Sequence, residues 1–286
     1  MTTVTTTTSP KAWGMDVLGV KPDKIIPNAL IMLATSKAGE VEGDQPAVRV
    51  PAVMVDDEIG FVPEGAPIPE SDQDLDELVI HTGKIAQLIK VSREQLSQPD
   101  ALTTILNGQR RDLTAKADWA FLQQPAPVAP ATHPPAGLLH FASDAGPLEG
   151  NLDALIDAQT LVHSVGDVSG EELPVIVIAS PNSYAYLRKL KKGTGSEENL
   201  LGAGVEVGPP YVLGMPVYVK KSMPENKIVV LDRSQVLSAY GDVQVARSDE
   251  FYFGSDNVAL RATFRFGVGV LDPQAVQVLT IPDDTP

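Results

Sequence analysis

Residues 58–92 read EIGFVPEGAPIPESDQDLDELVIHTGKIAQLIKVS, and the first two-thirds of this stretch offers almost nothing that could form a core. Nine acidic residues lie between Asp56 and Glu77, and no Lys or Arg occurs from Val50 to Gly83. Prolines at positions 51, 63, 67 and 69 break any continuous strand pairing, so the tip is predicted to be irregular. We call residues 48–83 the acidic arm, because this segment cannot bury itself in its own chain.

Strand-like sequences flank the acidic tip, with VRVPAVMV before it and KIAQLIKVS after it. Their apolar residues predict the two strands of a long hairpin: Val48, Val50 and Val53 on one side, and Ile85, Leu88 and Ile89 on the other. An ordinary surface loop is one interpretation. A functional loop is the other, because loops of this length without secondary structure are uncommon in compact domains and are usually functional.

Composition restricts the class of protein. The 286 residues suffice for one large or two moderate domains, no apolar run is long enough to span a membrane, and the start, MTTVTTTTSPKAWG, reads as a loosely tethered tail without the order of a signal peptide. The absence of cysteine excludes disulfides and thiol chemistry and fits a reducing compartment. A net charge of −15 disfavours tight binding to nucleic acid. We therefore expect a soluble, acidic protein that is not secreted.

A long amphipathic helix is predicted after the acidic arm, with start signals over 97–100. Its apolar face is formed by Leu102, Ile105, Leu106, Leu113, Ala117, Ala120 and Phe121, and its opposite side by Gln109, Arg110, Arg111 and Lys116. The Pro/Ala-rich segment 123–140 reads as a linker. The helix is long enough to act as a spine.

Helices and strands alternate beyond the linker. A helix is predicted around residues 152–162, a buried strand over 173–180, and a helix over 180–193 with Ser180 as its N-cap, Pro181 at its first position and Gly193 as its stop. Short strands are predicted in PVYVK, KIVVLD, QVLSAY and VQVAR, and a last strand over 275–281. In VALRATFRF, residues 258–266, alternation places Arg261 and Arg265 on one face, which is either a solvated sheet face or a landing site for acidic residues.

Signatures of catalysis are scarce. The sequence contains no nucleophile elbow, phosphate-binding loop or HExxH motif, its four histidines show no metal-ligand spacing, and the glycine-rich run 193–208 does not join a strand to a helix start. We therefore expect no enzyme, no cofactor and no metal. The rival interpretation is a carboxylate-based hydrolase that uses the α/β region 173–220.

The order of these parts resembles the major capsid proteins of tailed bacteriophages with the Hong Kong 97-type fold. Four stretches over residues 45–281 carry the resemblance: VPEGAPIPESD with KIAQLIKVSREQL; DWAFLQQ with PPAGLLHFAS; VIVIASPNSYAYLRKLKKGTG; and LGMPVYVKKSMPENKIVVLD with VALRATFRFGVGVLDPQAVQVL. The fold class that this resemblance implies is α+β, with a peripheral domain, an axial domain, an extended loop and an N-terminal arm. The implied boundaries are 1–30 for the arm, 31–47, 84–135 and 236–270 for the peripheral domain, 48–83 for the extended loop, and 136–235 with 271–286 for the axial domain.

The resemblance also implies a function. Such subunits form pentamers and hexamers that close into an icosahedral shell around double-stranded DNA, so we expect a virion protein that is assembled in the host cytoplasm. The expected partners are the chain itself, packaged DNA bound without sequence specificity, a separate scaffolding protein, a portal and a decoration protein, and we expect no membrane. The alternative is an encapsulin-type shell that encloses cargo enzymes.

In such a shell, the acidic arm would gain order by lying on a neighbouring copy, since groups unpaired in one subunit pair across an interface. The residues predicted to make contacts between subunits are Asp56, Asp57, Glu58, Phe61, Glu64, Ile68, Glu70, Asp72 and Glu77 of the arm, with Arg261 and Arg265 as their basic partners. Some members of the family link an arm lysine covalently to a neighbour. Because Glu77 occupies the matching position here, we expect no such crosslink.

Overall fold

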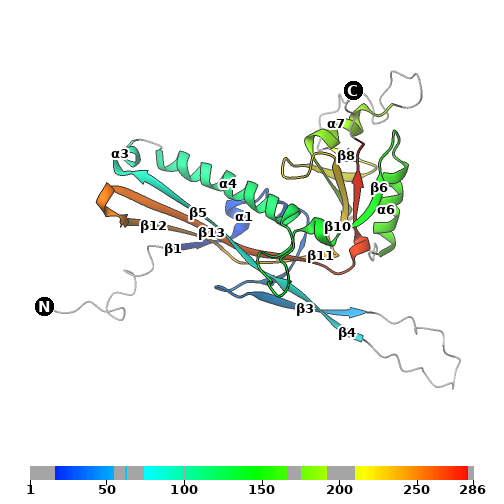
Figure 1. Ribbon diagram of the computed structural model, residues 1–286, viewed down its shortest axis with the longest axis horizontal. Helices are drawn as coiled ribbons and strands as arrows, with labels where there is room; N and C mark the ends of the chain where they lie inside the picture. The colour runs from blue at the N-terminus through cyan, green and yellow to red at the C-terminus, as the bar shows by residue number, and fades with distance from the viewer. Residues whose placement is uncertain are drawn as a thin grey trace.

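The computed structural model describes residues 17–54, 62, 74–98, 101–165, 175–191 and 210–282, which form two six-stranded sheets and a two-stranded hairpin (Figure 1). The first sheet contains β1 (Val17–Val20), β2 (Ser36–Glu40), β5 (Gly83–Ser92), β11 (Val236–Tyr240), β12 (Val243–Tyr252) and β13 (Asn257–Val270). The second contains β6 (Ser143–Pro147), β7 (Val175–Ala179), β8 (Tyr211–Val212), β9 (Met215–Val219), β10 (Lys227–Asp232) and β14 (Val276–Thr280). The hairpin contains β3 (Ala47–Met54) and β4 (Asp74–His81).

Helices cover both sheets. They are α1 (Pro22–Ile25), α2 (Leu30–Leu33), α3 (Arg93–Leu96), α4 (Ala101–Gln123), α5 (Leu138–Phe141), α6 (Asp153–Val165) and α7 (Pro181–Lys189), with the short 3-10 helices η1 (Phe253–Ser255) and η2 (Pro273–Ala275). The mixture of helices and antiparallel and parallel strands is the α+β class that the sequence predicted.

Strand β13 organises the first sheet because it is paired on both edges. β5 pairs antiparallel with residues 257–266 of β13, while β11 and β12 follow one another along the opposite edge. β13 also leads through η2 directly into β14 of the second sheet. One strand therefore fixes the positions of most of the described chain.

The hairpin differs from the prediction. Residues 47–54 pair with β4, residues 74–81, in a register that places Val50 opposite Leu78 and Val48 opposite Ile80. The segment KIAQLIKVS, which we expected to be the second strand of the hairpin, forms β5 and pairs with β13 instead. The sequence of β4, DLDELVIH, conceals its strand pattern because three of its first four residues are acidic.

The predicted spine helix is α4, whose 23 residues give a length of about 35 Å. It packs along β5 and β13, with Leu113, Ala117 and Phe121 buried against Phe264 in the largest hydrophobic cluster. Gln109 was predicted on the polar side of the helix. It is only 3% exposed, and its side-chain amide donates to the carbonyl oxygen of Leu260 at 3.5 Å. The amide nitrogen therefore reaches a backbone acceptor in the sheet, whereas the amide oxygen Oε1 is buried without a partner among the described residues.

The second sheet is buried on both faces. In β7, Ile176 and Ile178 join the cluster that contains α4, whereas Val175, Val177 and Ala179 face the cluster formed with α6 and α7. Ser180 caps α7 as predicted, because its hydroxyl accepts a hydrogen bond from the N–H of Ser183 at 3.0 Å. The prediction of Gly193 as the stop was wrong, because α7 ends at Lys189.

A buried carboxylate ties the N-terminal segment to the spine helix. Asp118 of α4 is 4% exposed; its Oδ1 accepts from the N–H of Leu30 at 2.6 Å and its Oδ2 lies 2.9 Å from Nζ of Lys220. The same Nζ donates to the carbonyl oxygen of Asn28 at 2.5 Å. Burial raises the pKa of the Asp118 carboxyl above its ordinary value of 3.8, and the hydrogen bond from Leu30 and the ammonium of Lys220 oppose this shift.

The hairpin crosses β13 where β13 carries glycine. A Cβ atom at Gly267 would lie 2.1 Å from the carbonyl oxygen of His81, and one at Gly269 would lie 2.9 Å from Cδ2 of Leu78. We predict that Gly267→Ala lowers the free energy of unfolding by about 1–3 kcal/mol, because a backbone atom cannot move aside without displacing the root of the hairpin. Urea unfolding of the isolated subunit measures this loss.

Gly108→Ala is the matched control for Gly267→Ala. A Cβ atom at Gly108, inside α4, would meet nothing within 4 Å, so the same change should raise stability by about 0.5–1 kcal/mol through helix propensity. Equal effects of the two substitutions would contradict the close crossing of β4 over β13.

Lys220→Met removes the cation that faces the Asp118 carboxylate, and we expect it to lower the free energy of unfolding by about 3 kcal/mol at neutral pH. Since the folded-state pKa of Asp118 is raised, the stability that its protonation provides is present below 3.8 and is lost as pH rises through the raised pKa. Lys220→Met removes two of the causes that lower this pKa, so the Asp118 pKa rises further in the variant and its loss of stability should shrink as pH falls below 7. Lys221→Met, a change at an exposed neighbour, should alter stability by less than about 0.5 kcal/mol, and similar losses in both variants would refute the pairing.

Candidate inter-subunit surfaces

The root of the acidic arm is anchored on the first sheet. On one face of the hairpin, Val48, Val50 and Leu78 pack with the buried residues Val41, Ile80 and Ala239 in a small hydrophobic cluster. The strands then continue outward, and Figure 1 shows β3 and β4 pointing away from both sheets. At about 3.3 Å per residue, the eight residues of each strand give the arm a stem of about 26 Å.

Glu77 lies in the stem of the arm. Its Oε1 is 2.8 Å from Nη1 of Arg49, diagonally across the hairpin, and both side chains are at least half exposed. The other arm residues predicted to contact a neighbour lie outside the described residues: Asp56, Asp57, Glu58, Phe61, Glu64, Ile68, Glu70 and Asp72. A role of the arm residues in contacts between subunits stays a prediction.

The alternation predicted for VALRATFRF is confirmed. Val258, Leu260 and Phe264 are buried towards α4, while Arg261 is exposed on the opposite face of β13. Arg265 lies on the same face, so the sheet brings the two predicted arginines together. Their outward position results from the two-residue period of the strand.

Two lysines join these arginines, and the sequence reasoning missed both. In the register of β5 with β13, Lys84 is directly opposite Arg265 and Leu88 is directly opposite Arg261, and Lys90 follows two residues later on the same exposed side. We call Lys84, Lys90, Arg261 and Arg265 the basic sheet face. The even spacing of Lys84 and Lys90 within one strand was a signal that could have identified them.

Arg265 is engaged within its own chain. Its Nη1 donates to Oγ1 of Thr82 at 3.1 Å and to the carbonyl oxygen of Gln45 at 3.3 Å, both at the root of the hairpin. Lys90 lies over the ring of Tyr252, with its Nζ 5.0 Å from the ring centroid. Lys84 and Arg261 are therefore the exposed members of the basic sheet face without a polar contact among the described residues, whereas Arg265 links this face to the arm.

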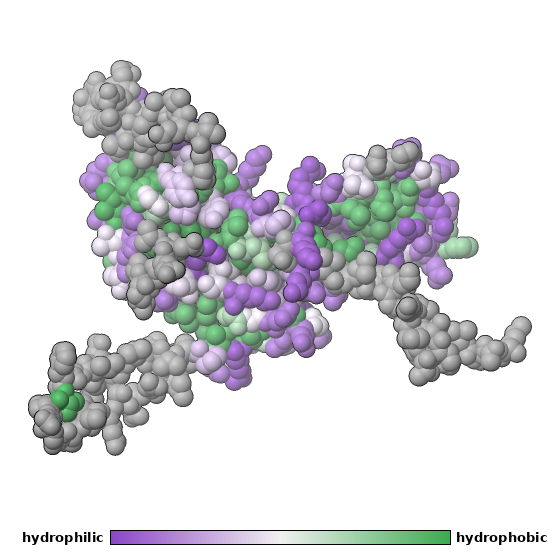
Figure 2. All heavy atoms as spheres, turned by 180° about the vertical axis from the view of Figure 1, so that it is seen from behind, coloured by the Kyte–Doolittle hydropathy of each residue, from purple (hydrophilic) through white to green (hydrophobic). Residues whose placement is uncertain are grey.

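An exposed aromatic pair marks the end of the first sheet. Phe251 of β12 is 65% exposed and Phe253 of η1 is 82% exposed. Figure 2 shows hydrophobic side chains gathered at this end of the molecule, which carries α3 and the β12–β13 turn. Contiguous exposed apolar surface is a common feature of interaction sites, so this end of the sheet is a second candidate surface for contacts between subunits.

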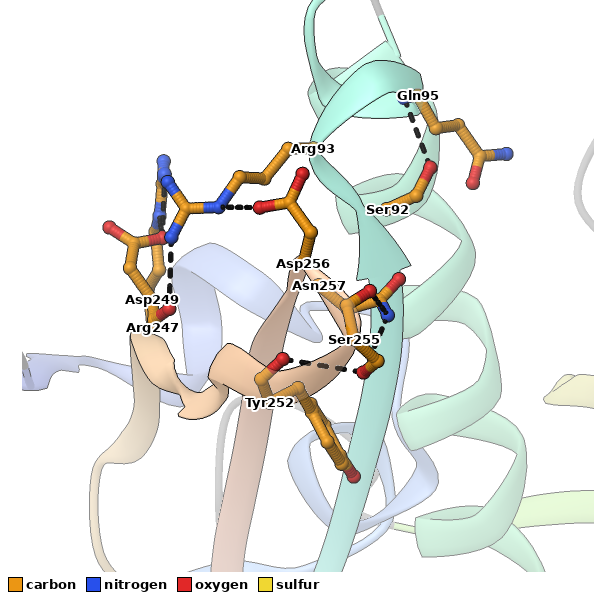
Figure 3. Close-up of polar contacts among 9 residues, drawn as sticks. All are labelled: Ser92, Arg93, Gln95, Arg247, Asp249, Tyr252, Ser255, Asp256 and Asn257. Atoms are coloured by element: carbon orange, nitrogen blue, oxygen red, sulfur yellow. Dashed lines mark hydrogen bonds and ion pairs between the residues drawn. The ribbon is translucent and has the colours of Figure 1, made fainter.

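Polar contacts fix the turn that carries these rings (Figure 3). Nε of Arg93 lies 2.9 Å from Oδ1 of Asp256, and its Nη2 donates to the carbonyl oxygen of Asp249 at 3.1 Å. The Asp249 carboxylate in turn accepts from Nε of Arg247 at 2.9 Å. Asp256 adopts a left-handed conformation, with φ of 49°, which closes the turn. The start of α3 therefore holds the β12–β13 turn in one shape.

In the part of the chain that the structure describes, no group of three or more His, Asp or Glu side chains is arranged to hold a metal ion. Among the same residues, no helix combines the length and the apolar character needed to cross a membrane.

Comparison with known proteins gives the family. A family profile described as "Phage capsid family" matches residues 28–281, and the chain belongs to this family. It is accordingly a structural subunit of a capsid shell and a component of a virion, and the encapsulin alternative is not favoured. Family and fold together favour a structural role without enzymatic activity. No curated protein matches the sequence.

Solved capsid structures share the fold. A structure of Gordonia phage Cozz has a TM-score of 0.67 at 17% identity, covering 90% of this chain and 87% of that chain. One of Microbacterium phage Oxtober96 has a TM-score of 0.66 at 18% identity over 98% of this chain and 100% of that chain. The capsid of a native GTA particle has a TM-score of 0.65 at 18% identity, covering 94% of this chain and 93% of that chain. At such low identity, these structures establish the fold alone.

Arg93→Ala should release the β12–β13 turn without unfolding the protein. The pairs that Arg93 makes are exposed, so we expect a loss of only about 0–1 kcal/mol in global stability. Amide exchange over residues 249–257 should nevertheless become faster, because the turn loses its links to α3. Unchanged exchange in this segment would mean that the strands alone hold the turn.

Proposed function

We propose that this subunit assembles with copies of itself into pentamers and hexamers of an icosahedral shell that encloses double-stranded DNA, and that its acidic arm lies on the basic sheet face of a neighbour. In this proposal, the chain has the Hong Kong 97-type organisation. The first sheet with α4 forms the peripheral domain, and the second sheet with α6 and α7 forms the axial domain. A separate scaffolding protein, a portal and a decoration protein would be further partners, and assembly would take place in the host cytoplasm.

Charge complementarity carries the proposal. The arm contains nine acidic residues between Asp56 and Glu77 and no Lys or Arg from Val50 to Gly83, whereas the basic sheet face presents four cations on two adjacent strands. The stem points away from the sheets of its own subunit, whereas the four cations lie on the sheet surface. The acidic arm of one copy is therefore placed to reach the basic sheet face of another copy. Each exposed pair contributes only about 0–1 kcal/mol. A closed shell repeats such contacts many times, so their sum stabilises the shell. Each single contact is weak enough to break and form again during assembly.

The location of the hairpin root supports this geometry. Gly267 and Gly269, over which β4 crosses, lie on the same face of β13 as Arg261 and Arg265. The arm of each copy thus starts on the sheet face on which the arm of another copy would end. Such reciprocity is what a self-assembling subunit needs, because every copy both provides an arm and receives one.

We expect Arg261→Glu to reduce assembly, because it places a carboxylate where the neighbour's arm brings more carboxylates. Electron microscopy and sedimentation of the purified protein measure the fraction in shells. A complementary change in the arm, Glu64→Lys, should restore part of that fraction. Arg188→Glu, an equal charge reversal at an exposed position of α7, should leave assembly unchanged.

Three outcomes of this experiment are informative. If Arg261→Glu alone forms shells in normal yield, the arm does not bind at the basic sheet face of a neighbour. A wild-type protein that remains a single subunit at micromolar concentration would overturn assembly itself and favour the hydrolase alternative. Shells that contain one specific protein cargo in place of nucleic acid would favour the encapsulin alternative.

A further inference from the structure

A basic groove lies on the other side of the molecule's first sheet, along the outer face of α4. It has a volume of about 430 Å³ and is enclosed by the segment 25–28, by α4 and by the turn 220–222 that follows β9. Its charged lining residues are Arg110, Arg111, Lys220 and Lys221, with Asp118 as the one carboxylate. Four cations around one carboxylate are unexpected in a chain whose net charge is −15.

Two of the four cations are held in place. Nε of Arg110 donates to the carbonyl oxygen of Ile25 at 2.9 Å, and its Nη2 donates to that of Lys24 at 3.2 Å. Lys220 is held by Asp118 and by the carbonyl oxygen of Asn28. Neutral carbonyl groups hold Arg110, so its charge is positioned without being neutralised. The Asp118 carboxylate offsets the charge of Lys220, so four cations and one carboxylate leave the groove with three net positive charges.

The other two cations are available. Arg111 and Lys221 are exposed, and neither forms a hydrogen bond or an ion pair with any residue that the structure describes. Asn107 lines the same groove about one helical turn before Arg110 and Arg111, and Thr114 lines it about one turn after them, where its hydroxyl donates to the carbonyl oxygen of Arg110 at 2.8 Å. Arg, Lys, Asn and Thr side chains are the donors that commonly contact phosphate oxygens.

We infer that this groove binds phosphate groups of a DNA backbone, without reading sequence. The inference rests on the proposed function, because the enclosed genome would supply the DNA. Two cations from α4 and two from the turn after β9 lie around one groove, which fits a ligand that presents several anionic oxygens close together.

Charge density favours DNA over an acidic peptide. Nine carboxylates over the 22 residues of the arm from Asp56 to Glu77 amount to one charge per about 8 Å of an extended chain. Duplex DNA carries one charge per about 1.7 Å of its axis and releases condensed counterions when a cation binds. A compact group of four cations therefore gains more from DNA. Because the remainder of the chain is acidic, the binding should be weak and reversible, as a shell that releases its genome requires.

The salt dependence of binding tests the inference. We would measure the fluorescence anisotropy of a labelled duplex of about 20 base pairs with the unassembled full-length subunit, starting near 50 mM salt. With three phosphate contacts, one for each net positive charge of the groove, the logarithm of the association constant should fall with the logarithm of salt concentration with a slope of about −2.7. Arg111→Gln/Lys221→Gln should reduce the magnitude of the slope by about 2 and weaken binding about tenfold or more at the lowest salt.

The matched control is Arg188→Gln/Lys189→Gln, which removes two exposed charges from α7 and should leave the slope unchanged. Equal effects of the two double variants would mean that only net charge matters and would overturn the groove. Absence of DNA binding at low salt would also overturn the inference. The same holds if a synthetic peptide of residues 56–77 binds the wild type more tightly than the duplex does and fails to bind Arg111→Gln/Lys221→Gln. Shell formation is measured separately by electron microscopy. If the wild type forms shells but the salt slope of DNA binding does not change in Arg111→Gln/Lys221→Gln, only this inference is wrong. If the wild type forms no shells, the proposed function is wrong.

Discussion

β13 is hydrogen-bonded along both edges and carries glycine where β4 crosses it, and the positions of the other functional parts follow from this arrangement. Its alternate residues divide the first sheet into a buried face under α4 and an outward face that carries Arg261 and Arg265. The root of the arm packs on that outward face because Gly267 and Gly269 leave room for the backbone of β4. A side chain at either glycine would separate the arm from the strand that aims it.

Charge is distributed unevenly in this subunit, and the distribution explains how copies with a net charge of −15 can associate. Like-charged copies repel at long range, so association needs local surfaces of opposite sign. The basic sheet face is such a surface for the arm of a neighbouring copy, whereas the basic groove, along α4 on the other side of the first sheet, would serve the enclosed DNA. Attraction between exposed charges is screened within about 10 Å at 0.1 M salt, which makes these contacts sensitive to the ionic conditions of assembly.

The long periodic elements could be predicted from the sequence, because each has a pattern of its own. The spine helix, β7, β10 and the alternation of β13 are of this kind. The partner of β3 could not be identified in this way, since acidic residues in β4 obscure its strand pattern and β5 offered a clearer one. The buried positions of Gln109 and Asp118 were also missed, because their partners, Leu260, Leu30 and Lys220, lie far away in the sequence. Only the folded chain shows that the Gln109 amide has an acceptor and that the Asp118 carboxylate has a donor and a counter-charge.

The central claim is that the acidic arm belongs to a neighbour's surface. Amide hydrogen exchange of residues 55–73 tests it most directly, compared between the unassembled subunit and the purified shell under the same buffer conditions. If the arm is seated on an adjacent copy, these amides exchange much more slowly in the shell. The same exchange in both states would show that the arm finds no partner there, and the account of assembly given above would be wrong.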